Sequence, residues 1–232
     1  MGLFAIIGVF MVTSMIVGNR LKKKMKKYSQ VGLANGLSGR EIAELMLKDN
    51  GIYDVSITSV EGHLTDHYNP ANKTVNLSPD VYTGRSVTAA AVAAHECGHA
   101  VQHATAYSFL EFRSAMVPVQ NVSAKIMNIM FMMMLFGMFF AQSFLPIETA
   151  LIIIIAVNAV FTLFAFVTLP VEYDASNRAL AWIKDRNIVN PEEHAMAKDA
   201  LNAAASTYLV VALSALATLL YYVLMYLGVS RD

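Results

Sequence analysis

Residues 93–100 read Ala-Ala-His-Glu-Cys-Gly-His-Ala, a His-Glu-x-x-His motif inside an alanine-rich stretch with helical spacing. Residues four apart lie on one face of an α-helix, about one turn from each other. His95 and His99 can therefore offer two imidazole nitrogens to one metal ion, and Glu96 lies near enough to reach a water activated by that ion. The pattern predicts a zinc hydrolase site with Glu96 as general base, provided that the chain supplies a third ligand.

The composition of the 232-residue chain indicates a membrane protein. Hydrophobic residues make up 56% of the chain and the mean hydropathy is +0.49, both too high for an ordinary soluble domain. The formal net charge is zero, which gives no indication of a nucleic-acid partner. Cys97 is the single cysteine, so no intramolecular disulfide can form. Its position, about 200° around the helix from His95, predicts a small packed residue and not a ligand.

Four apolar stretches predict transmembrane helices. The first, residues 2–19, has no basic residue before it and is followed by a basic cluster that ends at Lys27, which is typical of a retained anchor and not of a cleaved signal peptide. A basic amphipathic surface helix is the alternative, but the stretch is apolar all round. Residues 126–169 hold two apolar runs joined by a short connector, 146–149, and predict a membrane hairpin. Residues 207–229 give the fourth span.

A polar segment between the first two spans, residues 28–112, is predicted to form a soluble α+β domain. Residues 38–41, Ser-Gly-Arg-Glu, match a capping box and predict the start of a helix. Residues 54–60 and 73–77 resemble short strands separated by turn-forming residues, which predicts a hairpin or a small sheet. A helix over residues 86–105 then carries the His-Glu motif.

A second polar segment, residues 170–205, is expected to be helical. One helix is expected to begin at Pro170, and another after Asn190, where proline and glutamate occupy the first and third helical positions. Both polar segments are rich in Lys and Arg, whereas the connector 146–149 has none and the C-terminal end has only Arg231. This asymmetry predicts that both polar segments are cytoplasmic and that both termini lie outside.

A catalytic zinc site needs three protein ligands and an open position. His103 continues the four-residue spacing of the motif and is the first candidate for the third ligand. It lies about 12 Å along the helix axis from His95, too far to share an ion that holds each ligand at about 2 Å. A partly buried or substrate-facing histidine is the better interpretation.

Two carboxylates after the third span, Glu172 and Asp174, are the other candidates. On a helix they point about 200° apart, so only one can face the metal. Asp174 has Arg178 four residues on, which favours a surface ion pair. Glu172 is followed on its own face by the small Ser176, which suits packing beside the metal helix. Glu172 is therefore the expected third ligand, and the alternative is an acidic residue at a membrane boundary with no ligand role.

The chain resembles a known family over nearly its whole length. The motifs that carry the likeness are residues 95–103, 172–176, 64–70 and 202–208. In these the chain is similar to the YugP-like neutral zinc metallopeptidases, which are bacterial membrane proteins. More distantly it resembles two groups of integral-membrane gluzincins, the HtpX-type quality-control proteases and the prenyl-protein CAAX proteases.

The resemblance implies a mostly α integral membrane protein of the bacterial inner membrane with a cytoplasmic zincin-like α+β domain. It implies His95, His99 and Glu172 as ligands of one zinc ion, and Glu96 as the base. The distant relatives tend to carry aspartate four residues after the ligand glutamate, where this chain has Ser176. This departure concerns the partner of a metal ligand and not the ligand itself.

These features favour a membrane-embedded zinc-dependent endopeptidase that cleaves peptides or proteins at the cytoplasmic membrane face. Misfolded membrane proteins are a candidate substrate class, and the lipid bilayer is the expected surrounding. The alternative is a non-catalytic, zinc-stabilised membrane scaffold or chaperone, against which the intact Glu96 argues. A small transporter is disfavoured because ionisable groups are nearly absent from the predicted spans.

An extended substrate is expected to pair with a strand edge near residues 73–77, because backbone hydrogen bonds position a peptide without demanding a sequence. The reaction also needs a donor that stabilises the developing oxyanion. Tyr208, His103 and His67 are the candidates.

Overall fold

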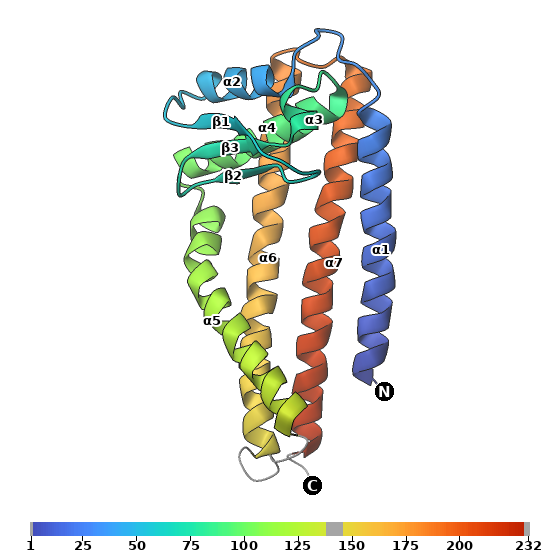
Figure 1. Ribbon diagram of the computed structural model, residues 1–232, viewed down its shortest axis with the longest axis vertical. Coiled ribbons are helices and arrows are strands. Elements are labelled where there is room, and N and C mark those ends of the chain that lie inside the picture. The colour runs from blue at the N-terminus through green and yellow to red at the C-terminus, as the bar shows by residue number, and fades with distance from the viewer. Residues whose placement is uncertain (1, 138–145, 230–232) are drawn as a thin grey trace. The chain divides into compact units, whose positions relative to one another are not determined.

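The computed structural model describes residues 2–137 and 146–229 and is mostly helical, with one small sheet (Figure 1). This confirms the predicted mostly α class. The elements in chain order are α1 (Gly2–Tyr28), α2 (Gly39–Asp49), β1 (Ser56–Ser59), β2 (His67–Asn69), β3 (Thr74–Leu77), α3 (Pro79–Tyr82), α4 (Val87–Ala104), α5 (Ser108–Gly137), α6 (Ile147–Asp185) and α7 (Pro191–Val229).

The chain divides into two compact units, and their boundaries fall inside the four long helices. The unit that holds α2, α3, α4 and the sheet, called here the α+β unit, consists of Ile16–Glu111 and Pro170–Thr207. The other, called here the apolar unit, consists of Met1–Met15, Phe112–Leu169 and Tyr208–Asp232. Every residue of the predicted metal site belongs to the α+β unit.

Three helices of the described chain, α1, α6 and α7, are long and apolar enough to cross a membrane, judged by length and composition. They contain the first, third and fourth predicted spans. The second predicted span, 126–145, overlaps α5 and continues into residues 138–145, which lie outside the described residues. Four spans therefore remain a prediction.

Helix α6 corrects two expectations about its region. It already begins at Ile147, inside the expected connector, because the Ala150 amide donates to the carbonyl of Pro146 at 3.0 Å and closes the first turn. It also continues through Pro170, which was expected to start a separate helix. A proline removes only one helical hydrogen bond. Where water is excluded, the helix is still the arrangement that satisfies the neighbouring backbone groups.

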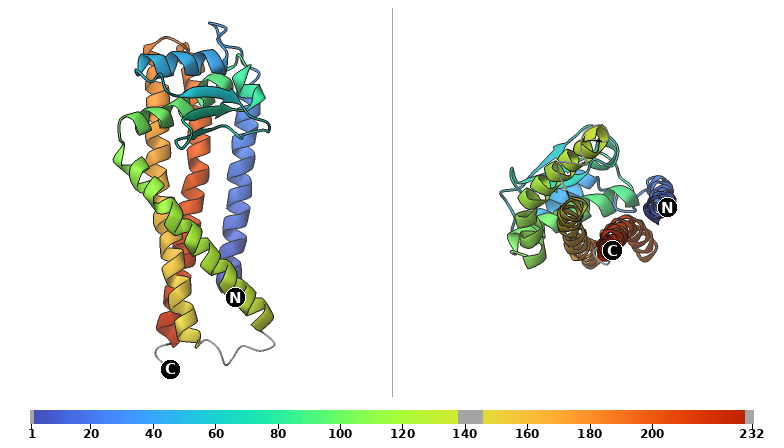
Figure 2. Two further views of the ribbon diagram at one scale, coloured as in Figure 1. Left: turned by 60° about the vertical axis from the view of Figure 1, so that its left-hand side comes forward. Right: turned by 90° about the horizontal axis from the view of Figure 1, so that it is seen from below.

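The sheet has the order β1-β3-β2, with β1 parallel and β2 antiparallel to β3. β1 and β3 are the two predicted strands, but the short β2 between them in sequence forms the hairpin with β3. β3 is consequently the central strand, so the expectation that residues 73–77 offer a free edge to a substrate is wrong. The edges belong to β1 and β2, and Figure 2 shows the three strands beside α4.

The predicted starts of α2, α7 and α4 are confirmed by their hydrogen bonds. At α2, the Ser38 hydroxyl accepts the Glu41 amide at 3.3 Å, and the Glu41 carboxylate accepts the Ser38 amide at 2.7 Å. At α7, Asn190 and Glu193 form the same reciprocal pair at 2.9 and 2.7 Å. α4 begins after Ser86, whose hydroxyl accepts the Ala89 amide at 3.2 Å.

The core of the α+β unit forms where α2 and the sheet pack against α4. Most residues of α4 are buried, and many are alanines, which let neighbouring elements approach closely. Cys97 is fully buried there, with its sulfur 3.7 Å from the carbonyl of Ala43 in α2. Burial raises the pKa of this thiol. Cys97 is therefore the packed residue that its helical position predicted.

Removing the α2 cap should destabilise the α+β unit. Ser38→Ala loses the acceptor for the Glu41 amide, which costs about 1 kcal/mol and should lower the unfolding temperature by about 3–6 °C. The fluorescence of Trp182, the single tryptophan, reports on this region, because its indole donates to Asp49 at the end of α2 at 2.9 Å. Ser38→Thr keeps the hydroxyl and should match the wild type. An unchanged midpoint for Ser38→Ala would contradict the role of the cap.

Candidate metal centre

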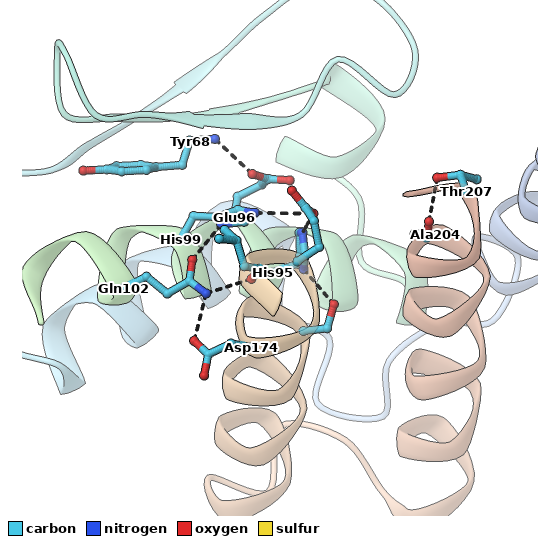
Figure 3. A network of polar contacts seen from close by, with 11 residues as sticks. Tyr68, His95, Glu96, His99, Gln102, Asp174, Ala204 and Thr207 are labelled. Carbon is cyan, nitrogen blue, oxygen red and sulfur yellow. Dashed lines mark hydrogen bonds and ion pairs between the residues drawn. The ribbon is translucent and has the colours of Figure 1, made fainter. Parts of the chain in front are cut away.

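Three side chains that could hold a metal ion meet between α4 and α6. His95 and His99 come from α4 (Figure 3), and Glu172 comes from α6. All three are largely buried, and their ligand atoms lie within 4.8 Å of one another. A Glu172 carboxylate oxygen is 3.4 Å from Nε2 of His95 and 3.8 Å from Nε2 of His99. Two ligands held about 2.0–2.1 Å from a tetrahedral zinc ion lie roughly 3.4 Å apart. The donor set therefore fits zinc, and the distance from Glu172 to His95 matches this spacing, whereas the widest pair must close from 4.8 Å to hold one ion.

Gly98 allows the two helices to come this close. A Cβ atom at this position would lie 2.5 Å from the carbonyl oxygen of Ala175 in α6, and 3.1 Å from its Cα. Real Cβ atoms do not approach backbone atoms so closely, so any larger residue must push α4 and α6 apart. A glycine inside an otherwise alanine-rich helix is unfavourable on propensity alone, and this close approach is its physical reason.

The second nitrogen of each histidine also has a partner. Nδ1 of His95 lies 3.1 Å from the hydroxyl of Ser176, and Nδ1 of His99 lies 3.0 Å from Oε1 of Gln102. Both rings therefore turn Nε2 towards Glu172. Ser176 stands where the distant relatives tend to carry aspartate, and it contacts a candidate ligand from that position.

The charges at the centre favour a cation. Burial alone would raise the pKa of Glu172, which follows the apolar stretch of α6, but hydrogen bonds with His95 and His99 lower it far below its usual range. For His99, burial acts to lower the pKa, but the hydrogen bond to Glu172 and the negative charges of Glu96 and Glu172 raise it. The carboxylate of Glu172 is therefore ionised, and its negative charge lies beside Nε2 of both histidines, where a cation would be attracted.

Glu96 lies beside the three side chains and is held by the sheet. Its Oε2 accepts the backbone amide of Tyr68 at 2.9 Å (Figure 3). Tyr68 belongs to β2, so an edge strand of the sheet runs next to the candidate base. This contact brings the sheet edge and the His-Glu motif together, although the edge is β2 and not the expected residues 73–77.

The three candidate oxyanion donors, His103, His67 and Tyr208, do not belong to the cluster of His95, His99 and Glu172. Nδ1 of His103 is 2.7 Å from the hydroxyl of Tyr68. His67 is exposed, and its Nδ1 is 2.7 Å from the carbonyl of Thr65. Tyr208 belongs to the apolar unit. The choice among these residues as oxyanion donor remains a prediction.

A series of hydrogen-bonded polar side chains behind His99 was not predicted from the sequence. Gln102 is fully buried, and its amide group donates to the carbonyl of Val171 and to Asp174, both at 2.8 Å. Asp174 forms the predicted ion pair with Arg178 at 2.5 Å, but both side chains are about two-thirds buried and Asp174 reaches inward to Gln102. The sequence feature that could have indicated this network is the glutamine three residues after His99 on the same helix.

The fold and the centre together indicate a membrane-associated zinc metallopeptidase, and comparison with known proteins gives the same class. The family model described as "Putative neutral zinc metallopeptidase" matches residues 3–227, so the chain belongs to this family. It is also 40% identical over 213 residues to the "Putative membrane protease YugP" of Bacillus subtilis (strain 168), which covers 92% of this chain and 91% of that protein. No solved structure matches the chain. The resemblance inferred from the motifs is thereby confirmed.

Replacing Gly98 should separate the helices that carry the centre. Glycine to alanine normally stabilises a helix interior by about 0.5–1 kcal/mol, but in Gly98→Ala the new methyl group would meet the carbonyl of Ala175. We expect a lower unfolding temperature and at least about tenfold weaker zinc binding, measured by chelator competition in detergent.

Gly18→Ala is the matched control for this experiment. Gly18 lies in helix α1 within the α+β unit, and nothing is found within 4 Å of its added Cβ. This variant should bind zinc as the wild type does. Wild-type zinc affinity in Gly98→Ala would show that the close approach of α4 and α6 is not required.

Proposed function

We propose that the chain is a membrane-embedded zinc-dependent endopeptidase that cleaves peptide bonds at the cytoplasmic membrane face. The observation that carries this proposal is the cluster of His95, His99 and Glu172, whose ligand atoms lie within 4.8 Å of one another. A further carboxylate, Glu96, is not part of that cluster but lies beside it (Figure 3). Membership of the metallopeptidase family supports the same reaction class.

In this proposal one zinc ion is held by Nε2 of His95, Nε2 of His99 and the carboxylate of Glu172. When bound there, zinc would supply Lewis-acid polarisation of the scissile carbonyl and would lower the pKa of the attacking water. Glu96 accepts a proton from the attacking water and delivers it to the leaving amine. The Tyr68 amide engages one Glu96 oxygen, Oε2, and the other oxygen, Oε1, is the one that we propose as the base.

An extended substrate adds to the sheet along β2. β2 is an edge strand, and its residue Tyr68 lies against Glu96, which places this edge near the reacting groups. Strand addition uses backbone hydrogen bonds and accepts many sequences. Peptides and unfolded or misfolded membrane proteins are therefore the proposed substrate class.

The position of Glu172 in α6 supports a site close to the membrane. Leu169 is the last residue of α6 that belongs to the apolar unit. Glu172 lies three residues after it, about 4.5 Å further along the helix. The distribution of Lys and Arg favours a cytoplasmic site with both termini outside. We propose four spans in a bacterial inner membrane.

Replacing the candidate base should separate catalysis from metal binding. Glu96→Gln keeps an oxygen that can accept the Tyr68 amide but cannot take a proton, so cleavage should fall by about 10²–10⁴-fold while bound zinc is unchanged. Zinc content and cleavage of an unfolded protein and of a membrane peptide should be measured in detergent. Equal cleavage by both proteins would exclude Glu96 as the base. A zinc-loaded wild type that cleaves neither substrate would favour the scaffold or chaperone alternative.

Replacing the third ligand should remove the metal. Glu172→Ala leaves two ligands, and we expect zinc affinity to fall by more than about 100-fold, beyond the 10–100-fold typical of lost outer hydrogen bonds. Glu44→Ala is the control, because Glu44 lies on the surface of α2 in an ion pair with Arg40. Full zinc retention by Glu172→Ala would rule out this ligand assignment.

A further inference from the structure

Gln102 has each of its polar atoms committed to a partner. The residue lies in α4, three positions after His99, and its side chain has no exposed surface. Its Nε2 donates to the Val171 carbonyl and to Asp174, and its Oε1 faces Nδ1 of His99 at 3.0 Å. The side chain therefore connects the ligand-bearing helix α4 with the part of α6 that carries Glu172.

The partners of Gln102 fix which way its amide points. A backbone carbonyl and a carboxylate can accept hydrogen bonds but cannot donate them, so Val171 and Asp174 both require the NH₂ group. A flipped amide would place its oxygen against two other oxygens. Oε1 must therefore face His99 and accept a hydrogen bond from Nδ1–H. In the neutral imidazole, the form that binds a metal, this leaves the lone pair of Nε2 on the side of Glu172.

The chain of contacts continues along α6. Asp174 accepts from Arg178 at 2.5 Å, and the Arg178 guanidinium lies over the ring of Tyr107, 5.7 Å from its centroid. Arg178 thus holds Asp174, and Asp174 holds the amide of Gln102. Because Asp174 is two residues after Glu172, one segment of α6 supplies a metal ligand and also orients a ligand of α4.

His95 lacks such a determinant. Its Nδ1 contacts the hydroxyl of Ser176, and a hydroxyl can either donate or accept. The two histidines of the motif are therefore held differently: the partner of His99 dictates its tautomer, whereas the partner of His95 permits both.

We infer that Gln102 is a positioning residue, which fixes the tautomer and ring orientation of His99 so that Nε2 is presented to the metal. This inference rests on the proposed zinc site and adds to it the device that aligns one ligand. Asp174 and Arg178 take part indirectly, since they set the orientation of the Gln102 amide.

Two substitutions at Gln102 separate positioning from packing. Gln102→Met keeps the volume but offers His99 no strong acceptor. Gln102→Glu keeps an acceptor for Nδ1–H but places a carboxylate against Asp174 and the Val171 carbonyl. Both variants should lower the unfolding temperature. Only Gln102→Met should weaken zinc binding, by about 10–100-fold, whereas Gln102→Glu should keep zinc affinity within about threefold of the wild type.

The readouts are zinc affinity by chelator competition and the histidine ¹⁵N chemical shifts of the zinc-loaded protein. The His99 shifts should stay at wild-type values in Gln102→Glu and change in Gln102→Met. If Gln102→Glu does not fold, the double variant with Asp174→Asn removes the repulsion and takes its place. Gln30→Met, at an exposed glutamine of the α+β unit, is the control for the amide-to-thioether change.

A purely structural role predicts a different result. Zinc affinity would then fall in both variants in proportion to their loss of stability, and the His99 shifts would stay unchanged in both; either outcome overturns the inference. These readouts do not depend on peptide cleavage. If the wild type binds zinc but cleaves nothing, the proposed function fails while the comparison at Gln102 still decides the role of this residue.

Discussion

The backbone contact between α4 and α6 at Gly98 and Ala175 is the constraint on which the centre depends. His95 and His99 lie three residues before and one residue after Gly98, and Glu172 and Ser176 lie at the same distances from Ala175. The polar side chains of both helices therefore lie on either side of the same backbone contact. The small residues at the crossing provide little side-chain packing but let the two backbones approach closely. The polar groups around the crossing form hydrogen bonds that hold the helices together.

Features that depend on a few neighbouring residues could be predicted from the sequence. The caps at Ser38 and Asn190 and both ends of α4 are local hydrogen-bonding patterns, and the structure contains them as expected. The pairing of His95 with His99 also followed from helical spacing, because a helix has a fixed geometry. Glu172 was expected from its place after the third predicted span, from the pairing of Asp174 with Arg178 and from the family resemblance. Their role as ligands is an inference from chemistry.

Features set by distant contacts were harder to predict. β2 has only three residues and no clear alternation of apolar and polar side chains, and it becomes a strand only because β3 lies beside it. This is why residues 73–77 were wrongly expected to form an edge of the sheet. Pro170 suggested a helix start because proline by itself favours the first turn of a helix. The surroundings that keep α6 continuous through this residue are not visible in the local sequence. Gln102 carries no motif by itself, and its importance appears only once Val171 and Asp174 are found beside it.

The hydrogen bond between Glu96 and the amide of Tyr68 has a consequence for how the chain can vary. Every amino acid except proline supplies that amide, so the orientation of Glu96 does not depend on which side chain occupies position 68. Alanine scanning would miss this contact, and evolution can change the residue without losing it. Proline at position 68 is the substitution that removes the donor while leaving Glu96 itself intact.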